Sequence, residues 1–225
     1  TGRKREMLID DWHPTWLRDL PEMAHLRAPG NTCLSACESL FRGEKAQNNS
    51  KGCGGIMRVA PMALLDAGYA SRNENTYSLE ELAEAGGEIA EVTHKHPLGF
   101  LPASLLTVLL YKIVPMTAKQ VQDEIDSIVA DTVNVLDRIY KGKYDADKRY
   151  LKELTEKAVR LAHSDISDAD AIRQLGEGWV AEETWAIALY CAIRHIDSVE
   201  DAIIASVNHD GDSDSTGSVC GNIMG

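Results

Sequence analysis

Three aspartates alternate near the C-terminal end of the chain, and their type and spacing could support metal chemistry. Asp210, Asp212 and Asp214 lie within five residues, and residues 196–225 hold six acidic residues and no lysine or arginine. Carboxylates this close repel one another unless water or a cation separates them, and hard divalent cations take carboxylate and hydroxyl oxygens. Gly211 and Gly217 allow the backbone to turn tightly around such an ion. The pattern therefore predicts a divalent-metal site, followed by a buried helix from about Ser218 whose N-terminus faces that site.

Other interpretations of the same segment either need no metal or require a different fold. A solvated acidic turn, with an aspartate as the N-cap of the following helix, is the simplest of them. An EF-hand loop is excluded because Ser215 stands where that loop requires glycine. The run from Asp212 to Thr216 also fits the D-x-D-x-T pattern of haloacid-dehalogenase phosphatases. Those enzymes place the pattern after a strand of an α/β sheet, whereas a helix is expected before it here.

A glycine-rich loop and two histidines are the next candidates. The run from Lys51 to Gly55 (KGCGG) has N–H groups that could cradle a diphosphate, although an ordinary turn before a helix is the alternative. The loop lacks the P-loop order, so nucleotide triphosphate hydrolysis is not indicated. His94 and His96 are two residues apart and do not share a helix face, which argues against a two-histidine zinc site on one helix. His94 could equally be a histidine at a helix C-terminus, before Pro97.

Five further side chains have open roles. Trp179 and Trp185 are expected in the core, with stacking on an adenine ring as the alternative. Arg58 could pair with an anion or form a structural ion pair. One glutamate of the pair Glu182 and Glu183 is expected to pair with a nearby cation.

The elements that must position these residues are helical. Capping boxes at Ser78–Glu81 and Thr117–Gln120 begin two helices, and alternating strand patterns are scarce. We expect an all-α single compact domain over residues 1–225. Further helices are expected after Asn31 with Leu34, Cys37 and Phe41 on one stripe, from Pro102 to about Ile113, through Leu151 and Leu161, from near Gly178, and from Ser198 to Val207, with loops at 71–77 and 141–148.

Composition narrows the function classes. The 225 residues are 44% hydrophobic and carry a formal charge of −12, so non-specific nucleic-acid binding is not expected. The sequence contains neither an apolar run long enough to span a membrane nor a signal-peptide pattern. Five cysteines form no C-x-x-C motif, which favours a reducing, cytoplasmic setting over a disulfide scaffold.

Four blocks, in order along the chain, resemble the ADP-ribosylglycohydrolase family of the dinitrogenase-reductase-activating type. Each block alone is weak, but four in this order, from about residue 12 to residue 225, are specific. The blocks are RAPGNTC at 27–33, NSKGCGGIMRVAP at 49–61, THKHP at 93–97 together with GWVAEE at 178–183, and GDSDSTG at 211–217.

The resemblance implies an all-α fold with a pair of Mg²⁺ or Mn²⁺ ions in a cleft. It also implies hydrolysis of the glycosidic bond at ribose C1″ between ADP-ribose and a protein side chain or a related acceptor. The implied partners are an ADP-ribosylated protein or an ADP-ribose conjugate, with no nucleic acid and no membrane. The catalytic acid or base is unassigned. The implied metal ligands are Asp212, Asp214 and Ser215, and the implied substrate contacts are Gly52, Cys53, Gly54, Gly55, Met57 and His94, with His94 lining the ribose pocket.

The sequence departs from the family pattern in three places. The family usually has threonine at the position of Ser215, and both side chains offer a hydroxyl. Family members carry an N-terminal G-D-x-x-G-type stretch and a T-D-D-T motif with the other metal ligands, whereas Asp10–Asp11 here lacks flanking threonines. Family members also usually continue beyond the position of Gly225. We therefore expect a chain shortened at both ends. A catalytically incomplete ADP-ribose-binding or regulatory fragment of the same fold is the alternative function.

Overall fold

The computed structural model describes residues 20–25, 28–72 and 76–225. Two units are distinguished along the chain, residues 1–30 and 31–225. The described part of the first unit contains the 3-10 helix η3 (Pro21–Ala24). Asp10–Asp11, Arg27 and part of the expected 71–77 loop lie outside the described residues.

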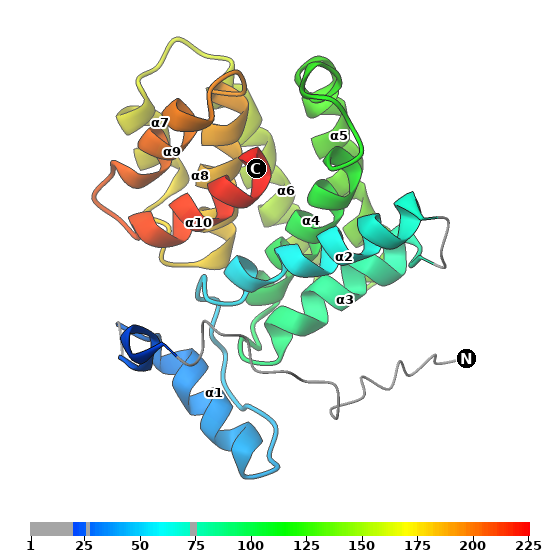
Figure 1. The fold of residues 1–225 in the computed structure, drawn as a ribbon, viewed down its shortest axis with the longest axis vertical. Coiled ribbons are helices and arrows are strands. Elements are labelled where there is room, and N and C mark those ends of the chain that lie inside the picture. The colour runs from blue at the N-terminus through cyan, green and yellow to red at the C-terminus, as the bar shows by residue number, and fades with distance from the viewer. Residues whose placement is uncertain (1–19, 26–27, 73–75) are drawn as a thin grey trace. The chain divides into compact units, whose positions relative to one another are not determined.

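The second unit is built from helices, and its described residues contain no strand (Figure 1). This confirms the all-α expectation and makes the α/β phosphatase interpretation wrong. The helices are α1 (Asn31–Phe41), η4 (Ile56–Arg58), α2 (Ala60–Ser71), α3 (Leu79–Glu91), α4 (Pro97–Ile113), α5 (Ala118–Ile139), α6 (Asp145–Ala162), α7 (Asp168–Leu175), α8 (Ala181–Arg194), α9 (Val199–Val207) and α10 (Ser213–Met224).

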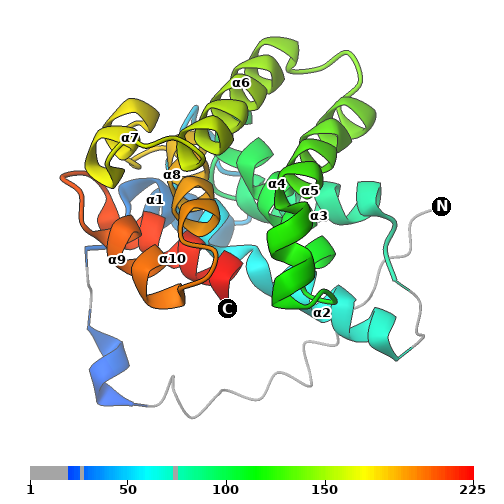
Figure 2. The same cartoon turned by 90° about the horizontal axis from the view of Figure 1, so that it is seen from above.

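Two apolar helices, α4 and α8, form the centre of this unit and pack against each other. Helix α4 also packs against α2, α3, α5 and α6, while α8 also packs against α6, α7, α9 and α10 (Figures 1 and 2). Both helices are apolar around most of their circumference, and a helix with that pattern is buried. Close packing of α3 on α4 requires glycine, because a Cβ atom at Gly86 would overlap the side chain of Thr107.

The amphipathic helices form where the sequence predicts them. Ser78 and Glu81 form a capping box at the start of α3, and Thr117 and Gln120 form another at the start of α5. Each box satisfies backbone N–H groups that would otherwise lack partners at a helix start. The apolar face of α5 is turned inward, with Ile125, Ile128, Val129 and Leu136 buried.

Several helix boundaries differ from the predictions. Helix α4 begins at Pro97, five residues before the predicted start, because the Nδ1 atom of His96 accepts a hydrogen bond from the Leu98 N–H at 3.0 Å and caps it. Helix α6 begins at Asp145, inside the predicted 141–148 loop. Helix α7 was not predicted, although Ser167 caps it by accepting from the Asp170 N–H at 3.2 Å.

Helix α1 forms as predicted, but its expected apolar stripe is not a core face. Leu34, Cys37 and Phe41 are exposed, Phe41 at 93% of its surface, and only Ala36 of this helix is buried. The first turn of α1 also contacts the segment before the glycine-rich loop, where the Thr32 hydroxyl lies 3.1 Å from the Ser50 hydroxyl.

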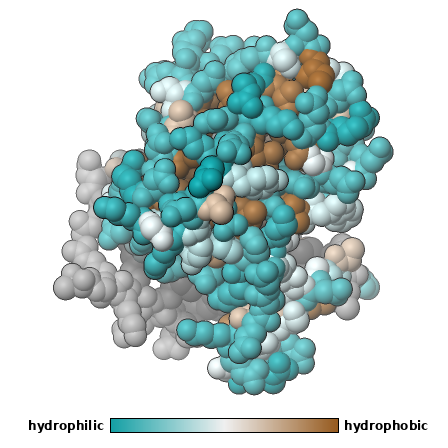
Figure 3. Space-filling model, turned by 180° about the vertical axis from the view of Figure 1, so that it is seen from behind, coloured by the Kyte–Doolittle hydropathy of each residue, from teal (hydrophilic) through white to brown (hydrophobic). Residues whose placement is uncertain are grey.

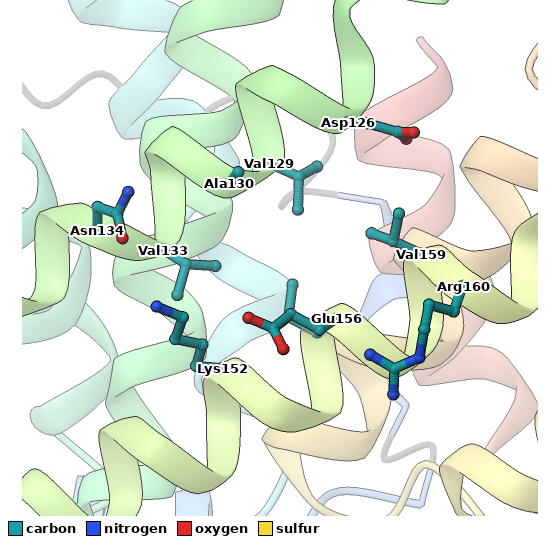
Figure 4. A pocket seen from close by; sticks show the side chains of 10 residues that line it. Asp126, Val129, Ala130, Val133, Asn134, Lys152, Glu156, Val159 and Arg160 are labelled. Carbon is teal, nitrogen blue, oxygen red and sulfur yellow. The ribbon is translucent and has the colours of Figure 1, made fainter.

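A hollow of about 360 Å³ lies between α5 and α6. Val129, Val133 and Val159 line it, together with charged side chains that include Asp126 and Lys152 (Figure 4). None of the site residues predicted from the sequence lies on its wall. On the face drawn in Figure 3, hydrophilic side chains predominate, with hydrophobic ones between them. Within the described ranges, no helix combines the length and hydrophobicity needed to cross a membrane.

Candidate functional site

The predicted metal ligands lie at the N-terminus of α10. This helix begins at Ser213, five residues before the predicted start, so Asp214 and Ser215 are in its first turn and Asp212 is the N-cap residue. Asp212 and Ser215 are buried, with 7% and 3% of their surfaces exposed, whereas Asp214 is exposed. The Asp212 side chain makes no capping hydrogen bond. A solvated N-capping turn therefore does not describe Asp212.

The carboxyl groups of Asp212 and Asp214 interact directly. The hydrogen bond between them, followed by burial, raises the pKa of Asp214. In the described ranges, neither lysine nor arginine forms an ion pair with either aspartate. Two adjacent carboxyl groups without a counter-ion, beside a buried hydroxyl and the positive end of a helix, form an anionic oxygen-rich cluster.

This donor set is of the kind that hard divalent cations select, since all three side chains offer oxygen. The set is also small. No group of three or more His, Cys, Asp or Glu side chains within the described ranges is placed to hold a metal ion. The three residues thus fit a cation of the Mg²⁺ or Mn²⁺ type as part of a coordination shell. Water or a bound ligand would have to supply other positions.

The backbone around Asp212 is held by contacts that only glycine permits. The Asp212 N–H donates to the Glu177 carbonyl at 2.7 Å, and a Cβ atom on Gly211 would overlap that carbonyl. The Nδ1 atom of His209 accepts from the Gly211 N–H at 3.1 Å. We therefore assign the proton of neutral His209 to Nε2, which lies 2.9 Å from the Thr216 hydroxyl. Burial lowers the pKa of His209, which agrees with the neutral form.

A second loop supports the same segment from the other side. Gly176 and Gly178 have positive φ angles of 137° and 82°, which glycine adopts readily. The Oε2 atom of Glu183 accepts from the N–H groups of Glu177 and Gly178 at 3.0 and 3.1 Å. Glu183 therefore holds the loop whose Glu177 carbonyl binds Asp212, a supporting role that the sequence pattern did not predict.

Cys53 joins the glycine-rich loop to the aspartate segment across 159 residues of sequence. Its Sγ atom donates to Oδ2 of Asp212 at 2.9 Å and lies 3.3 Å from the Ser215 hydroxyl. Burial and then the Asp212 carboxylate raise the pKa of Cys53 to about 12. Cys53 is therefore a thiol at neutral pH, and this is not the environment of an activated cysteine nucleophile.

His94 packs against the same loop. A Cβ atom added to Gly52 would lie 3.3 Å from Nε2 of His94, and one added to Gly54 would lie 3.2 Å from its Cε1. The two glycines therefore allow the loop backbone to approach the imidazole closely. His94 is 2% exposed, and burial followed by the Arg58 charge lowers its pKa to about 4, so the ring is neutral.

Arg58 and Thr93 hold the imidazole in place. The Arg58 guanidinium donates to the Thr93 hydroxyl at 2.6 Å and to the Ile89 carbonyl at the end of α3 at 2.8 Å. The Thr93 hydroxyl then has one proton to donate, and the Nδ1 atom of His94, at 2.7 Å, is nearer than the Ala90 carbonyl, at 3.4 Å. We therefore assign the His94 ring proton to Nε2, the side that faces the loop. In the described ranges Arg58 forms no ion pair with a carboxylate.

The expected pairing of a cation with Glu182 or Glu183 is also found. Lys51 Nζ bonds to Oε1 of Glu182, which is fully buried. The backbone is joined at the same place, because the Ala181 N–H donates to the Lys51 carbonyl at 2.8 Å and Gly52 forms an isolated antiparallel bridge with Val180. These backbone and side-chain contacts hold the glycine-rich loop against the start of α8.

The structure brings most of the predicted site residues together. Gly52, Gly54 and His94 form one cluster, and Cys53 contacts Asp212 and Ser215. The other two predicted substrate contacts pack against core elements instead. A Cβ atom on Gly55 would lie 2.9 Å from the Ala90 side chain, and Met57 packs against the hydrophobic core.

The two tryptophans differ. Trp185 is fully buried and donates to the Thr155 hydroxyl at 2.9 Å, which confirms core packing. Trp179 is 58% exposed, so core packing was the wrong expectation for it. It lies between Gly178, where a Cβ atom would be 3.7 Å from Cβ of Asp212, and Val180, which pairs with Gly52. An exposed indole therefore borders the site.

Comparisons with known proteins place the chain in a family. The family model for ADP-ribosylglycohydrolase matches residues 3–225. The chain is 24% identical over 208 residues to ADP-ribosylhydrolase ARH3 from Homo sapiens, and the same identity holds for ARH3 from Bos taurus and Mus musculus. These matches cover 84% of this chain and 53–54% of the relatives, so the chain spans about half the length of the curated relatives it matches. On this match, and with the all-α fold described above, the chain belongs to the ADP-ribosylglycohydrolase family.

Proposed function

We propose that this protein hydrolyses the glycosidic bond between ADP-ribose and an acceptor, such as a modified protein side chain, with a divalent cation at Asp212, Asp214 and Ser215. The observation that carries the proposal is the contact of Cys53 with Asp212 and Ser215. Through this contact the loop that would bind a diphosphate lies next to the residues that would hold a cation. Family membership and the name of the ARH3 relatives support the reaction class.

Each part of the site has a separate task in this proposal. Asp212, Asp214 and Ser215 would hold Mg²⁺ or Mn²⁺, which when bound orients ribose hydroxyls and polarises the bond to be broken. The glycine-rich loop would bind the diphosphate through the Gly54 N–H group, because the Gly52 N–H donates to the Ser50 hydroxyl at 3.3 Å and Gly55 is buried against Ala90. His94, neutral with its proton on Nε2, would donate a hydrogen bond to a ribose oxygen. The burial of Asp212 and His94 excludes water from the two anchoring groups and strengthens their polar contacts.

The net charge of −12 does not oppose this function. Asp212 and Asp214 by themselves would repel an anionic ligand. A divalent ion held by these residues would neutralise the two carboxylate charges and so remove their repulsion of ADP-ribose at this position. The proposal therefore predicts that metal and ADP-ribose bind with positive cooperativity.

The test is release of ADP-ribose from an ADP-ribosylated protein by the purified chain, with Mg²⁺, with Mn²⁺ and with a chelator. Asp212→Asn and Asp214→Asn should each lower the rate at least a hundredfold. Asp210→Asn removes the same charge from the exposed residue two positions before Asp212 and should stay within about twofold of wild type. Wild-type rates in Asp212→Asn would refute the site. Binding of ADP-ribose by wild type without any hydrolysis would favour the alternative, an ADP-ribose-binding fragment of the same fold.

A further inference from the structure

Glu182 is an unusual residue within this site. It lies in the first turn of α8, its side chain is 0% exposed, and its Oε2 atom has no hydrogen-bond partner among the described residues. Transfer of a carboxylate into such a place is costly unless it is paired and hydrogen-bonded. Burial raises the pKa of Glu182, and Lys51 opposes that shift. Lys51 is therefore the cation on which a charged Glu182 depends.

The two side chains of the Lys51–Glu182 ion pair differ in their exposure to solvent. The Lys51 side chain is 41% exposed, while the glutamate that holds it is fully buried. An ammonium group has three donors, of which Oε1 of Glu182 takes one. A purely structural buried ion pair would bury both charges. Here the protein holds the ammonium group on one side, while the lysine side chain as a whole is partly exposed to solvent.

The position of Lys51 is fixed at the backbone as well. Its carbonyl accepts from Ala181 at the start of α8, and the next residue, Gly52, forms the bridge with Val180 and packs against His94. The residue after that, Cys53, contacts Asp212. The partly exposed Lys51 side chain therefore belongs to the segment that joins the glycine-rich loop to the aspartate cluster. Glu182 restricts a long side chain that would otherwise sample many rotamers.

We propose that Glu182 is a positioning residue that holds the Lys51 ammonium ready to pair with the phosphate groups of an ADP-ribosyl ligand at the glycine-rich loop. This inference rests on the proposed function. Glu182 itself does not touch the ligand and acts through Lys51. Preorganisation lowers the entropy cost of forming the ammonium–phosphate contact when the ligand binds.

The inference is tested by a double-mutant cycle on equilibrium binding of ADP-ribose, measured by calorimetry with Mg²⁺ present. Lys51→Met should raise Kd about tenfold or more, since hydrogen bonds to charged groups are the stronger ones. Glu182→Gln keeps an uncharged group of the same shape and should raise Kd about threefold to tenfold. In the Lys51→Met background, Glu182→Gln should change Kd by less than twofold, because the residue it positions is gone.

Two further variants separate positioning from stability. Lys51→Met alone leaves Glu182 without its cation and could unfold the protein, but the double variant removes both charges and keeps the comparison possible. Lys119→Met removes the cation of an exposed pair with Asp123 on α5 and should leave Kd unchanged. The affinity of wild type should also fall more steeply with salt than that of Lys51→Met.

The outcomes distinguish the inference from the function on which it rests. If Glu182→Gln lowers Tm while Kd stays within twofold of wild type, the residue is structural and the inference is overturned. The same conclusion follows if Glu182→Gln raises Kd equally with and without Lys51. If wild type binds no ADP-ribose at all, the proposed function fails, and the inference fails with it.

Discussion

Replacing Gly211 by alanine tests the contacts that hold the segment around Asp212 in place. A Cβ atom at this position would overlap the Glu177 carbonyl and lie 2.8 Å from the Glu177 Cα atom, so the two loops would have to separate. The hydrogen bond from the Asp212 N–H to the same carbonyl, 2.7 Å long, would then be lost. The φ angle of Gly211 is not in the left-handed region, and the effect is therefore one of contact rather than of backbone strain.

The expected loss in the free energy of unfolding has two contributions, the steric overlap and the lost hydrogen bond. Overpacking costs about 1–3 kcal/mol, and the lost hydrogen bond adds about 1 kcal/mol, giving about 2–4 kcal/mol in the free energy of unfolding. At about 2–4 °C per kcal/mol for a chain of this size, Tm should fall by roughly 5–15 °C. If the proposed cation site exists, Mg²⁺ should raise the Tm of wild type because it binds the native state, and the displaced Asp212 should weaken that rise.

The measurement is a thermal melt followed by circular dichroism, with and without Mg²⁺. Gly68→Ala is the matched control, because Gly68 lies within α2 and no described atom lies within 4 Å of its added Cβ. Alanine is the better helix former by about 1 kcal/mol, so this variant should melt a few degrees higher than wild type. A Gly211→Ala protein that melts within 2 °C of wild type would refute the packing argument.

Two other predictions concern His94 and Trp179. Burial lowers the pKa of His94 to about 4, from a value near 6.5 in the unfolded chain. Between about pH 6.5 and about pH 4 the imidazole is therefore protonated in the unfolded chain but not in the folded protein. The free energy of unfolding therefore falls as the pH falls from about 6.5 to about 4. His94→Gln should remove up to about 3 kcal/mol of that pH dependence, measured by urea titrations at pH values between about 4 and 7. An equal pH dependence of stability in wild type and His94→Gln would contradict the assignment. Trp179→Ala should weaken ADP-ribose binding by about tenfold, since stacking on a base contributes about 1–3 kcal/mol, and Trp179→Phe should restore most of it. Unchanged calorimetric affinity in Trp179→Ala would remove the indole from the site.

Local patterns were enough to predict most helices. The capping boxes at Ser78 and Thr117 act between residues three apart, so a sequence window contains both partners. The continuous apolar run of α4 likewise predicts burial without reference to other elements. The predictions failed where a boundary depended on a less common device, such as the His96 cap of α4.

The segment around Asp212 shows more clearly what local sequence patterns cannot predict. Alternating carboxylates and glycines predicted a cation site, but they predicted a helix start at Ser218 rather than Ser213. The helix begins earlier because Asp212 is anchored to Glu177 and Thr216 to the Ser206 carbonyl at 2.7 Å. Those partners lie on other segments and leave no periodic signal near the aspartates.

The sequence by itself determined the helical class, the order of the motifs and the chemical types at the site, because helix propensity, capping and hydrophobic period act over a few residues. Only the tertiary structure decided which of these groups meet. It placed Cys53 on Asp212 and Lys51 on Glu182, at separations of 159 and 131 residues. It also left Trp179 exposed and buried Trp185, although the two are only six residues apart in the sequence. Contacts of that range depend on how α4 and α8 pack, and packing is set by the shapes of all the surrounding side chains together.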